Sequence, residues 1–162
     1  MGKTLVVGYG NLDREDDGVA WHVLVRLAEG LGLPPPVQDS DGLPQVDDQP
    51  DLLCLLQLDP GLAEVIAGYD RVCFVDAHTG AYPQDIRFAH IEGQFQASPF
   101  THHMTPETCL ALAQTLHGCV PNGMVLSVKG HQFGFSNTLS PATAELAEQA
   151  TQVLIGWLAS QE

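Results

Sequence analysis

The feature of the sequence that most constrains its fold is a regular alternation of short apolar runs with longer amphipathic segments. Short apolar runs predict buried strands, whereas apolar residues spaced three and four apart predict helices that cover a sheet. Strands are predicted at residues 4–9, 52–58, 71–77, 85–92 and 124–133, and helices over 17–29 and from Pro60, Pro106 and Pro141. This order predicts an α/β fold, a three-layer sandwich with helices on both faces of a mostly parallel sheet.

The length and the turn residues predict how these elements are organised. The 162 residues are enough for one hydrophobic core and too few for two, so residues 1–162 are predicted to form a single domain. Residues 30–51 are rich in Pro, Asp and Gly, and we expect them to form a surface excursion with at most one short strand. Residues 85–92 alternate in polarity, which favours an antiparallel strand at the edge of the sheet.

The charge of the chain excludes some classes of partner. The sequence holds 20 Asp and Glu against 6 Lys and Arg, a net charge of −14. Nucleic acids and anionic membranes are bound by clusters of Lys and Arg, so we expect neither as a partner. Metal cations and basic protein surfaces are favoured, although acidity also serves solubility. Without a membrane-length apolar run, a leader or metal-type cysteine spacing, the chain is expected to be soluble and cytoplasmic.

An acidic turn links the first predicted strand to the first helix. Its sequence is "GYGNLDREDDG", residues 8–18. A glycine turn at this place often holds a phosphate, but the four carboxylates here would repel one. Asp16 and Asp17 stand where a helix begins, so capping and metal ligation both remain open, with capping favoured for Asp16. Asp13 and Glu15 are expected to form a solvated rim.

Polar side chains follow the predicted strands at three places. Asp17 belongs to the acidic turn, Asp76 ends the strand at 71–77, and His102 and His103 precede the helix at Pro106. The carboxyl ends of parallel strands meet at one edge of a sheet, where α/β proteins bind their ligands. Two carboxylates and one imidazole there would suit nickel, zinc or a similar divalent ion. The two histidines are adjacent, so only one of them can point inward.

The remaining histidines and the possible nucleophiles give weaker indications of a functional site. His78 closely follows Asp76, and His131 lies in the last predicted strand, so either could reach the site. We interpret His22 and His117 as surface or structural residues. No Ser or Cys stands in a nucleophile elbow such as GxSxG.

Four motifs, in order, resemble those of the [NiFe]-hydrogenase maturation proteases. They are "GYGN…DDGV", "FVDA", "HHMTPETCLAL" and "GFSNTLSP", and "QLDPGLAEVI" is similar to a further segment of that family. These endopeptidases remove a C-terminal peptide from the hydrogenase large subunit after nickel insertion. The resemblance covers nearly the whole chain, with residues 34–51 matched least. It implies a twisted five-stranded sheet with helices on both faces.

The resemblance also implies a site and a mechanism. The metal-binding residues of the family fall on Asp17, Asp76 and His102, with His103 as the alternative if the register differs by one. The nickel arrives in the precursor, held partly by the precursor's own cysteines, and the protease completes its coordination. A metal-loaded substrate then licenses cleavage, through a polarised carbonyl or an activated water. The implied partner is the large-subunit precursor. For a one-to-one encounter with this larger protein, a monomer is the default expectation.

Three other functions compete with this one. A Rossmann-type nucleotide binder is disfavoured, because Asp13 occupies the place of the third glycine of the fingerprint. A nickel checkpoint or metallochaperone without peptidase activity would use the same ligands. A conventional metallohydrolase would hold its own permanent metal and would purify with it.

Overall fold

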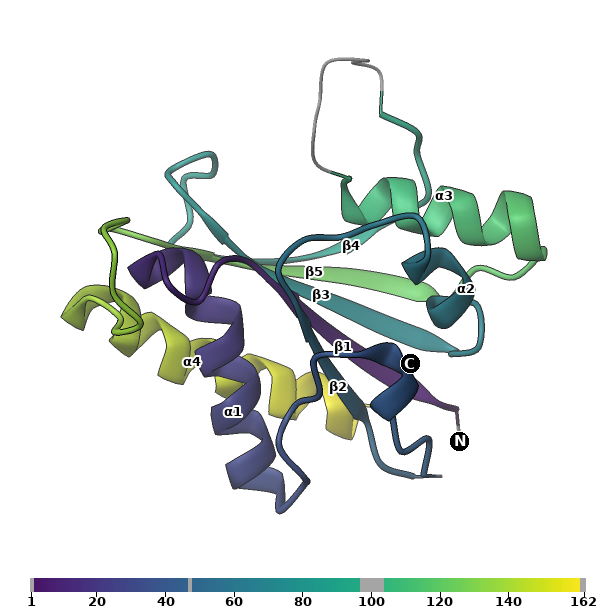
Figure 1. Cartoon of the computed structure of the whole chain (residues 1–162), viewed down its shortest axis with the longest axis horizontal. Helices are drawn as coiled ribbons and strands as arrows, with labels where there is room; N and C mark the ends of the chain where they lie inside the picture. The colour runs from purple at the N-terminus through teal and green to yellow at the C-terminus, as the bar shows by residue number, and fades with distance from the viewer. Residues whose placement is uncertain (1, 47, 97–103, 161–162) are drawn as a thin grey trace.

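A computed structural model describes residues 2–46, 48–96 and 104–160. Within these ranges it shows one β-sheet with four α-helices packed against it (Figure 1). The strand order is β2-β1-β3-β5-β4. The strands are β1 (Thr4–Tyr9), β2 (Asp51–Leu55), β3 (Arg71–His78), β4 (Ile86–Ile91) and β5 (Asn122–Lys129). All pairs are parallel except β4 with β5. The predicted mostly parallel, five-stranded sheet with an antiparallel edge is confirmed.

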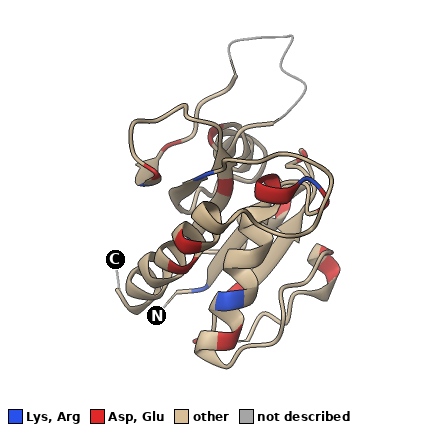
Figure 2. Ribbon diagram, turned by 90° about the vertical axis from the view of Figure 1, so that its left-hand side faces the viewer, with Lys and Arg blue, Asp and Glu red and all other residues tan. Residues whose placement is uncertain are grey.

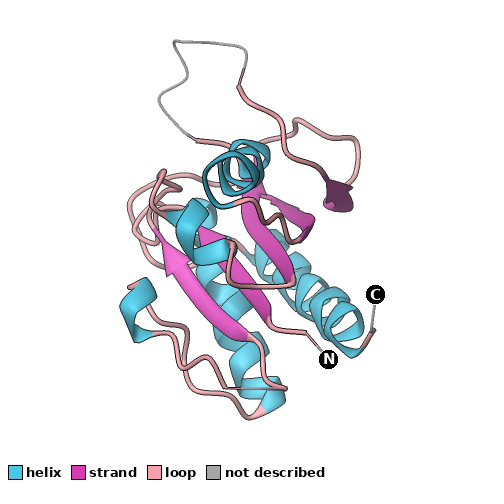
Figure 3. Cartoon of the chain, turned by 90° about the vertical axis from the view of Figure 1, so that its right-hand side faces the viewer, coloured by secondary structure: helices cyan, strands magenta, loops and turns pink. Residues whose placement is uncertain are grey.

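Helices cover both faces of the sheet, as the three-layer prediction requires (Figure 3). On one face lie α1 (Val19–Leu31) and α4 (Pro141–Ala159), and on the other lie α2 (Leu62–Ile66) and α3 (Pro106–His117). Alternate residues of each strand point to opposite faces and thus enter different cores. In the described part of the chain no helix is long and apolar enough to cross a membrane.

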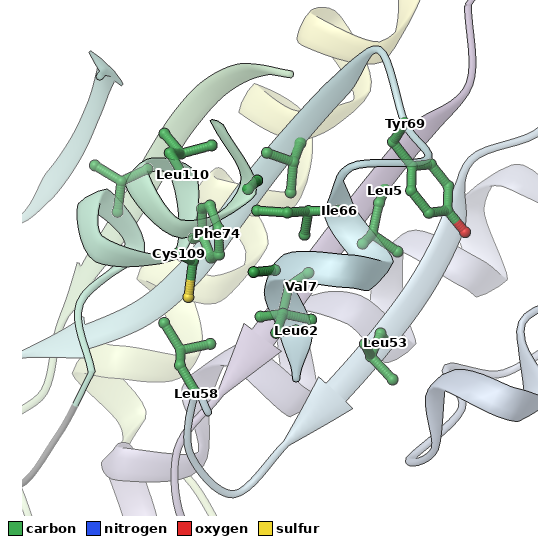
Figure 4. Packing of buried hydrophobic residues seen from close by; sticks show 14 of the residues in the cluster. Leu5, Val7, Leu53, Leu58, Leu62, Ile66, Tyr69, Phe74, Cys109 and Leu110 are labelled. Atoms are coloured by element: carbon green, nitrogen blue, oxygen red, sulfur yellow. The ribbon is translucent and has the colours of Figure 1, made fainter. Parts of the chain in front are cut away.

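The core beneath α2 and α3 extends to the edge where the strands end. Leu5 and Val7 of β1 and Phe74 of β3 are fully buried there, packed against Ile66 of α2 and Leu110 of α3 (Figure 4). Burying a large aliphatic or aromatic side chain stabilises a fold by about 1.5–3 kcal/mol. Continuing the same alternation along the strands brings polar side chains onto this face at their carboxyl ends.

The helix boundaries follow the capping signals. The Thr105 side chain accepts the Thr108 N–H, and the Ser140 side chain accepts the Thr143 N–H, each just before a proline at the first turn. Gly118 ends α3 with φ +69°, a left-handed conformation that glycine adopts without strain. The predicted starts of α3 and α4 are therefore confirmed.

Three predicted boundaries are wrong. The strand predicted over 52–58 ends at Leu55, after which Leu56 is 67% exposed. The strand predicted to reach residue 133 ends at Lys129, because the following backbone N–H groups turn to a carboxylate of the acidic turn. The first helix begins at Val19, since Glu15–Gly18 forms a separate 3-10 turn, η1.

Candidate functional site

The candidate site lies where β1, β3 and β5 end, next to η1 and the first turn of α3 (Figure 1). Figure 2 looks toward this end of the sheet and shows Asp and Glu positions over several helices and loops, with few Lys and Arg positions. Three neighbouring strands each contribute one polar side chain on the same face. These are Tyr9, Asp76 and Ser127, of which the last two are direct partners in the β3–β5 register.

Asp76 is held by a hydrogen bond to each of its carboxylate oxygens. The Tyr9 hydroxyl donates to Oδ2 at 2.6 Å, and the Ser127 hydroxyl donates to Oδ1 at 2.6 Å. Burial raises the pKa of Asp76, while these two bonds act in the opposite direction. Burial and the neighbouring carboxylate also raise the pKa of Tyr9, so its hydroxyl remains a donor. The carboxylate is thus fixed in orientation at the end of a buried strand.

Asp17 is positioned by the loop before it. Its Oδ2 accepts the Asn11 N–H at 2.8 Å, and its backbone N–H bonds to the Arg14 carbonyl. Gly10 has φ +142°, and a Cβ there would collide with the Asp17 carbonyl oxygen. Only glycine fits this close approach. The turn therefore holds Asp17 by one carboxylate oxygen, and its side chain does not cap α1.

Asp16 has a structural role that differs from the predicted one. The fully buried carboxylate accepts hydrogen bonds from the backbone of His131, Gln132 and Ser140 and from the hydroxyls of Ser140 and Thr143. Burial alone would raise the pKa of Asp16, but these donors lower it to about 2. Asp16 therefore anchors the start of α4, and the prediction that it caps the first helix is wrong.

The third predicted ligand cannot be placed. His102 and its alternative, His103, lie outside the described residues. Within 2–46, 48–96 and 104–160, no three His, Cys, Asp or Glu side chains are grouped closely enough to hold a metal ion. The structure brings Asp17 and Asp76 to the same end of the sheet, and the ligand set of the sequence prediction stays a prediction.

Sequence reasoning missed three residues of this site. Tyr9 and Ser127 bond to Asp76, and Glu107, in the first turn of α3, adds to the effect of burial in raising the pKa of Asp76. Strand alternation places Tyr9 and Ser127 on the correct face, but only the strand order makes them neighbours of Asp76. The capping signal at Thr105 predicts where α3 begins, and it could therefore have placed Glu107 in the first turn of that helix.

The structure shows the positions of His78 and His131, the two histidines that the sequence allowed to reach the site. His131 is exposed in the loop after β5, with Nδ1 2.8 Å from the Thr143 hydroxyl. His78 ends β3 and is only 6% exposed. Its Nδ1 accepts the Gly80 N–H at 3.1 Å, and its buried Nε2 has no partner among the described residues.

The fold is that of solved hydrogenase maturation proteases. No family model and no curated protein matches the sequence. The structure is similar to the [NiFe] hydrogenase maturation protease HycI from Thermococcus kodakarensis KOD1, with a TM-score of 0.68, 18% identity, and 98% of this chain and 93% of that chain covered. It is also similar to HybD, the hydrogenase maturating endopeptidase from E. coli, with a TM-score of 0.61, 18% identity, and coverages of 96% and 91%. For the hydrogenase 2 maturation peptidase from Thaumarchaeota archaeon SCGC_AB-539-E09, the TM-score is 0.58 at 16% identity, and 97% of this chain and 98% of that chain are covered.

Proposed function

We propose that this protein is an endopeptidase that removes the C-terminal peptide of a [NiFe]-hydrogenase large-subunit precursor after nickel insertion. The observation that carries the proposal is the doubly held Asp76, at the same sheet edge as Asp17, in a fold shared over nearly its whole length with maturation proteases. The ordered motifs of the sequence support the same activity.

In this proposal the nickel belongs to the substrate. Asp17, Asp76 and His102, or His103 in the other register, complete the coordination of a nickel ion that the precursor already holds. Carboxylate and imidazole are suitable donors for nickel, and the precursor's cysteine thiolates supply the softer ligands. Three protein ligands without a thiolate bind nickel weakly alone, so the metal leaves with the mature subunit.

Charge explains why an empty precursor would be left uncleaved. Asp17, Asp76 and Glu107 form the acidic part of the site on a chain of net charge −14, so this part gives no charge attraction to a scissile peptide that carries no cation. A bound nickel ion reverses this balance and brings the scissile peptide to the site. The nickel then polarises the peptide carbonyl or activates water. Binding of the correct substrate thereby assembles the reactive site.

The test follows the mass of a hydrogenase large-subunit precursor, nickel-loaded or nickel-free, mixed with the protein. We expect a C-terminal peptide to be released only from the loaded precursor. Asp17→Ala, Asp76→Ala and His102→Ala should each abolish the release. If His103→Ala abolishes it and His102→Ala does not, the other register holds. Loss of the peptide from nickel-free precursor would contradict the proposal.

The competing function is a nickel checkpoint or metallochaperone, which would bind the loaded precursor and leave its mass unchanged. A conventional metallohydrolase would instead show stoichiometric metal in the purified protein. We propose that the enzyme acts as a monomer in the cytoplasm, and gel filtration with the precursor tests the stoichiometry of this encounter.

A further inference from the structure

Three side chains beside the candidate site form a cluster that the proposed cleavage does not use. The Arg87 guanidinium of β4 lies 4.4 Å from the centroid of the Tyr82 ring. The Tyr82 ring in turn makes an edge contact with the His78 ring, with 5.2 Å between centroids. We call these residues the His78–Tyr82–Arg87 cluster. It joins the end of β3, the turn that follows and the edge strand.

The cluster lies on the same face of the sheet as Asp76. In the β4–β5 register Arg87 pairs with Ser127, whose hydroxyl bonds to Asp76. In the β3–β5 register His78 pairs with Lys129. Directly paired residues present their side chains on one face, so Arg87 and Lys129 lie on the same face of the sheet as Asp76, with Ser127 between Arg87 and the carboxylate.

The described part of the chain offers no acidic partner to Arg87 or Lys129. The chain has only 6 Lys and Arg against 20 Asp and Glu, yet neither Arg87 nor Lys129 forms a salt bridge with any residue that the structure describes. By contrast, Arg26 on α1 lies 3.5 Å from Glu148. In so acidic a protein, two half-buried cations that have no acidic partner among the described residues favour an anion supplied from outside.

His78 supplies an independent observation of the same kind. Its Nδ1 accepts the Gly80 N–H, so the ring proton sits on Nε2. That N–H is buried, the side chain is 6% exposed, and no acceptor is found for it within the described ranges. A buried donor without an acceptor is destabilising and is uncommon unless a ligand or water satisfies it.

We propose that the His78–Tyr82–Arg87 cluster, with Lys129, binds a carboxylate of the substrate polypeptide beside Asp76. The identity of that substrate rests on the proposed function. Arginine presents a planar fork of N–H groups that matches a carboxylate, and Lys129 adds charge. The Tyr82 ring makes an edge contact with His78, and in this proposal it moves aside when the carboxylate reaches the Nε2 proton.

The proposal gives the substrate a direction across the sheet edge. A carboxylate is drawn to the Arg87 side, while the nickel is drawn to Asp17 and Asp76. Opposite charges at the two ends of the site favour one orientation of the bound peptide over its reverse.

The test uses nuclear magnetic resonance of the full-length, ¹⁵N-labelled protein. Side-chain signals of His78 Nε2–H and Arg87 Nε–H are followed during titration with N-acetylglutamate α-amide, which carries a side-chain carboxylate, and N-acetylalanine, which carries a terminal one. N-acetylglutamine amide is the neutral control. We expect saturable shifts of both signals with one or both carboxylates and none with the amide, and the stronger binder identifies the kind of carboxylate.

Variants complete the test. Arg87→Gln should weaken binding of the carboxylate about tenfold, as loss of a charge-assisted pair does. Arg26→Gln, which changes the net charge equally, should leave it unchanged. Should Arg87→Gln fail to fold, Lys129→Gln serves in its place. No saturable shift, an equal response to the neutral amide, or equal weakening by Arg26→Gln would overturn the proposal. Because these probes are not cleaved, that result would leave the peptidase assay unaffected, and failure of the peptidase assay would leave this binding intact.

Discussion

At the scale of single residues, the site depends on how firmly Asp76 is held. Both of its oxygens accept a hydroxyl hydrogen bond of 2.6 Å, from Tyr9 and from Ser127, while Asp17 is bonded at one oxygen only. Substitution of a group that orients a metal-binding carboxylate commonly lowers metal affinity or activity by about 10- to 100-fold. Tyr9 and Ser127 thus fix the orientation of Asp76, and under the proposed function they act as its positioning residues.

Tyr9→Phe tests this positioning, because it removes one of the two bonds and little volume. We expect cleavage of the nickel-loaded precursor to fall roughly 10-fold or more, measured as kcat/KM. Tyr69→Phe is the matched control: its hydroxyl also makes a 2.6 Å bond to a carboxylate, that of Asp51, but at the start of β2. An equal loss of kcat/KM in the two variants would show that the Tyr9 effect is only structural.

The sequence predicts part of this site and misses the rest for a physical reason. Asp17 lies in the turn after β1 and Asp76 near the carboxyl end of β3, and the carboxyl ends of parallel strands share one edge, so their common location was predictable. Tyr9 and Ser127 became neighbours of Asp76 only through the order β1-β3-β5, which strand alternation does not determine. The partners of Asp16 are 115 to 127 residues away in sequence, beyond the reach of local capping rules.

At the scale of elements, Asp16 is the residue that joins η1 to the loop after β5 and to α4. Asp16→Asn keeps the size of the side chain and removes the charge that five donor groups share. Hydrogen bonds to a charged group contribute about 1.5–3 kcal/mol, so we expect unfolding free energy to drop by about 3 kcal/mol. Urea unfolding should show a lower midpoint at an unchanged m value. Asp13→Asn, on an exposed residue of the same turn, should change stability by about 0.5 kcal/mol or less.

The same carboxylate predicts how stability depends on pH. The pKa of Asp16 is lowered from 3.8 to about 2, so its contribution is present above pH 3.8 and is lost as the pH falls toward 2. The size of this contribution is about 2 kcal/mol, from a shift of this magnitude. Urea midpoints should be measured at several pH values from about 5 down to about 2. Over this range the midpoint should fall more steeply for the wild type than for Asp16→Asn. Parallel curves would contradict the assignment.

The elements themselves were predicted well where capping and periodicity agreed. Thr105, Pro106 and Gly118 marked α3 correctly, since each acts locally: Thr105 caps the helix with its side chain, and Pro106 and Gly118 act through their own backbone conformations. The end of β5 was predicted too late, because the residues after Lys129 retain some apolar character while their N–H groups bond to Asp16. A distant carboxylate decided that boundary, and no local pattern could show it.

At the scale of the whole molecule, the arrangement of layers predicts which thiols react. Cys54, Cys73 and Cys109 are buried in the layers, and Cys119 is exposed after α3. Burial raises the pKa of both Cys54 and Cys109 to about 12, which further suppresses their thiolates. We expect a thiol reagent to label Cys119 rapidly in the native protein and all four cysteines after unfolding. Rapid native labelling of a second cysteine would contradict the packing.

The most direct measurement compares the cleaved fraction of the precursor with its nickel occupancy. Precursor samples with occupancies from zero to full are incubated to completion with a catalytic amount of the protein, and intact mass gives the fraction that has lost its C-terminal peptide. If the protein cleaves only where a substrate-borne nickel ion meets Asp17 and Asp76, the cleaved fraction should equal the occupancy in every sample. A cleaved fraction independent of occupancy would show a protease that does not detect nickel, and an intact precursor at full occupancy would show that this fold serves another function here.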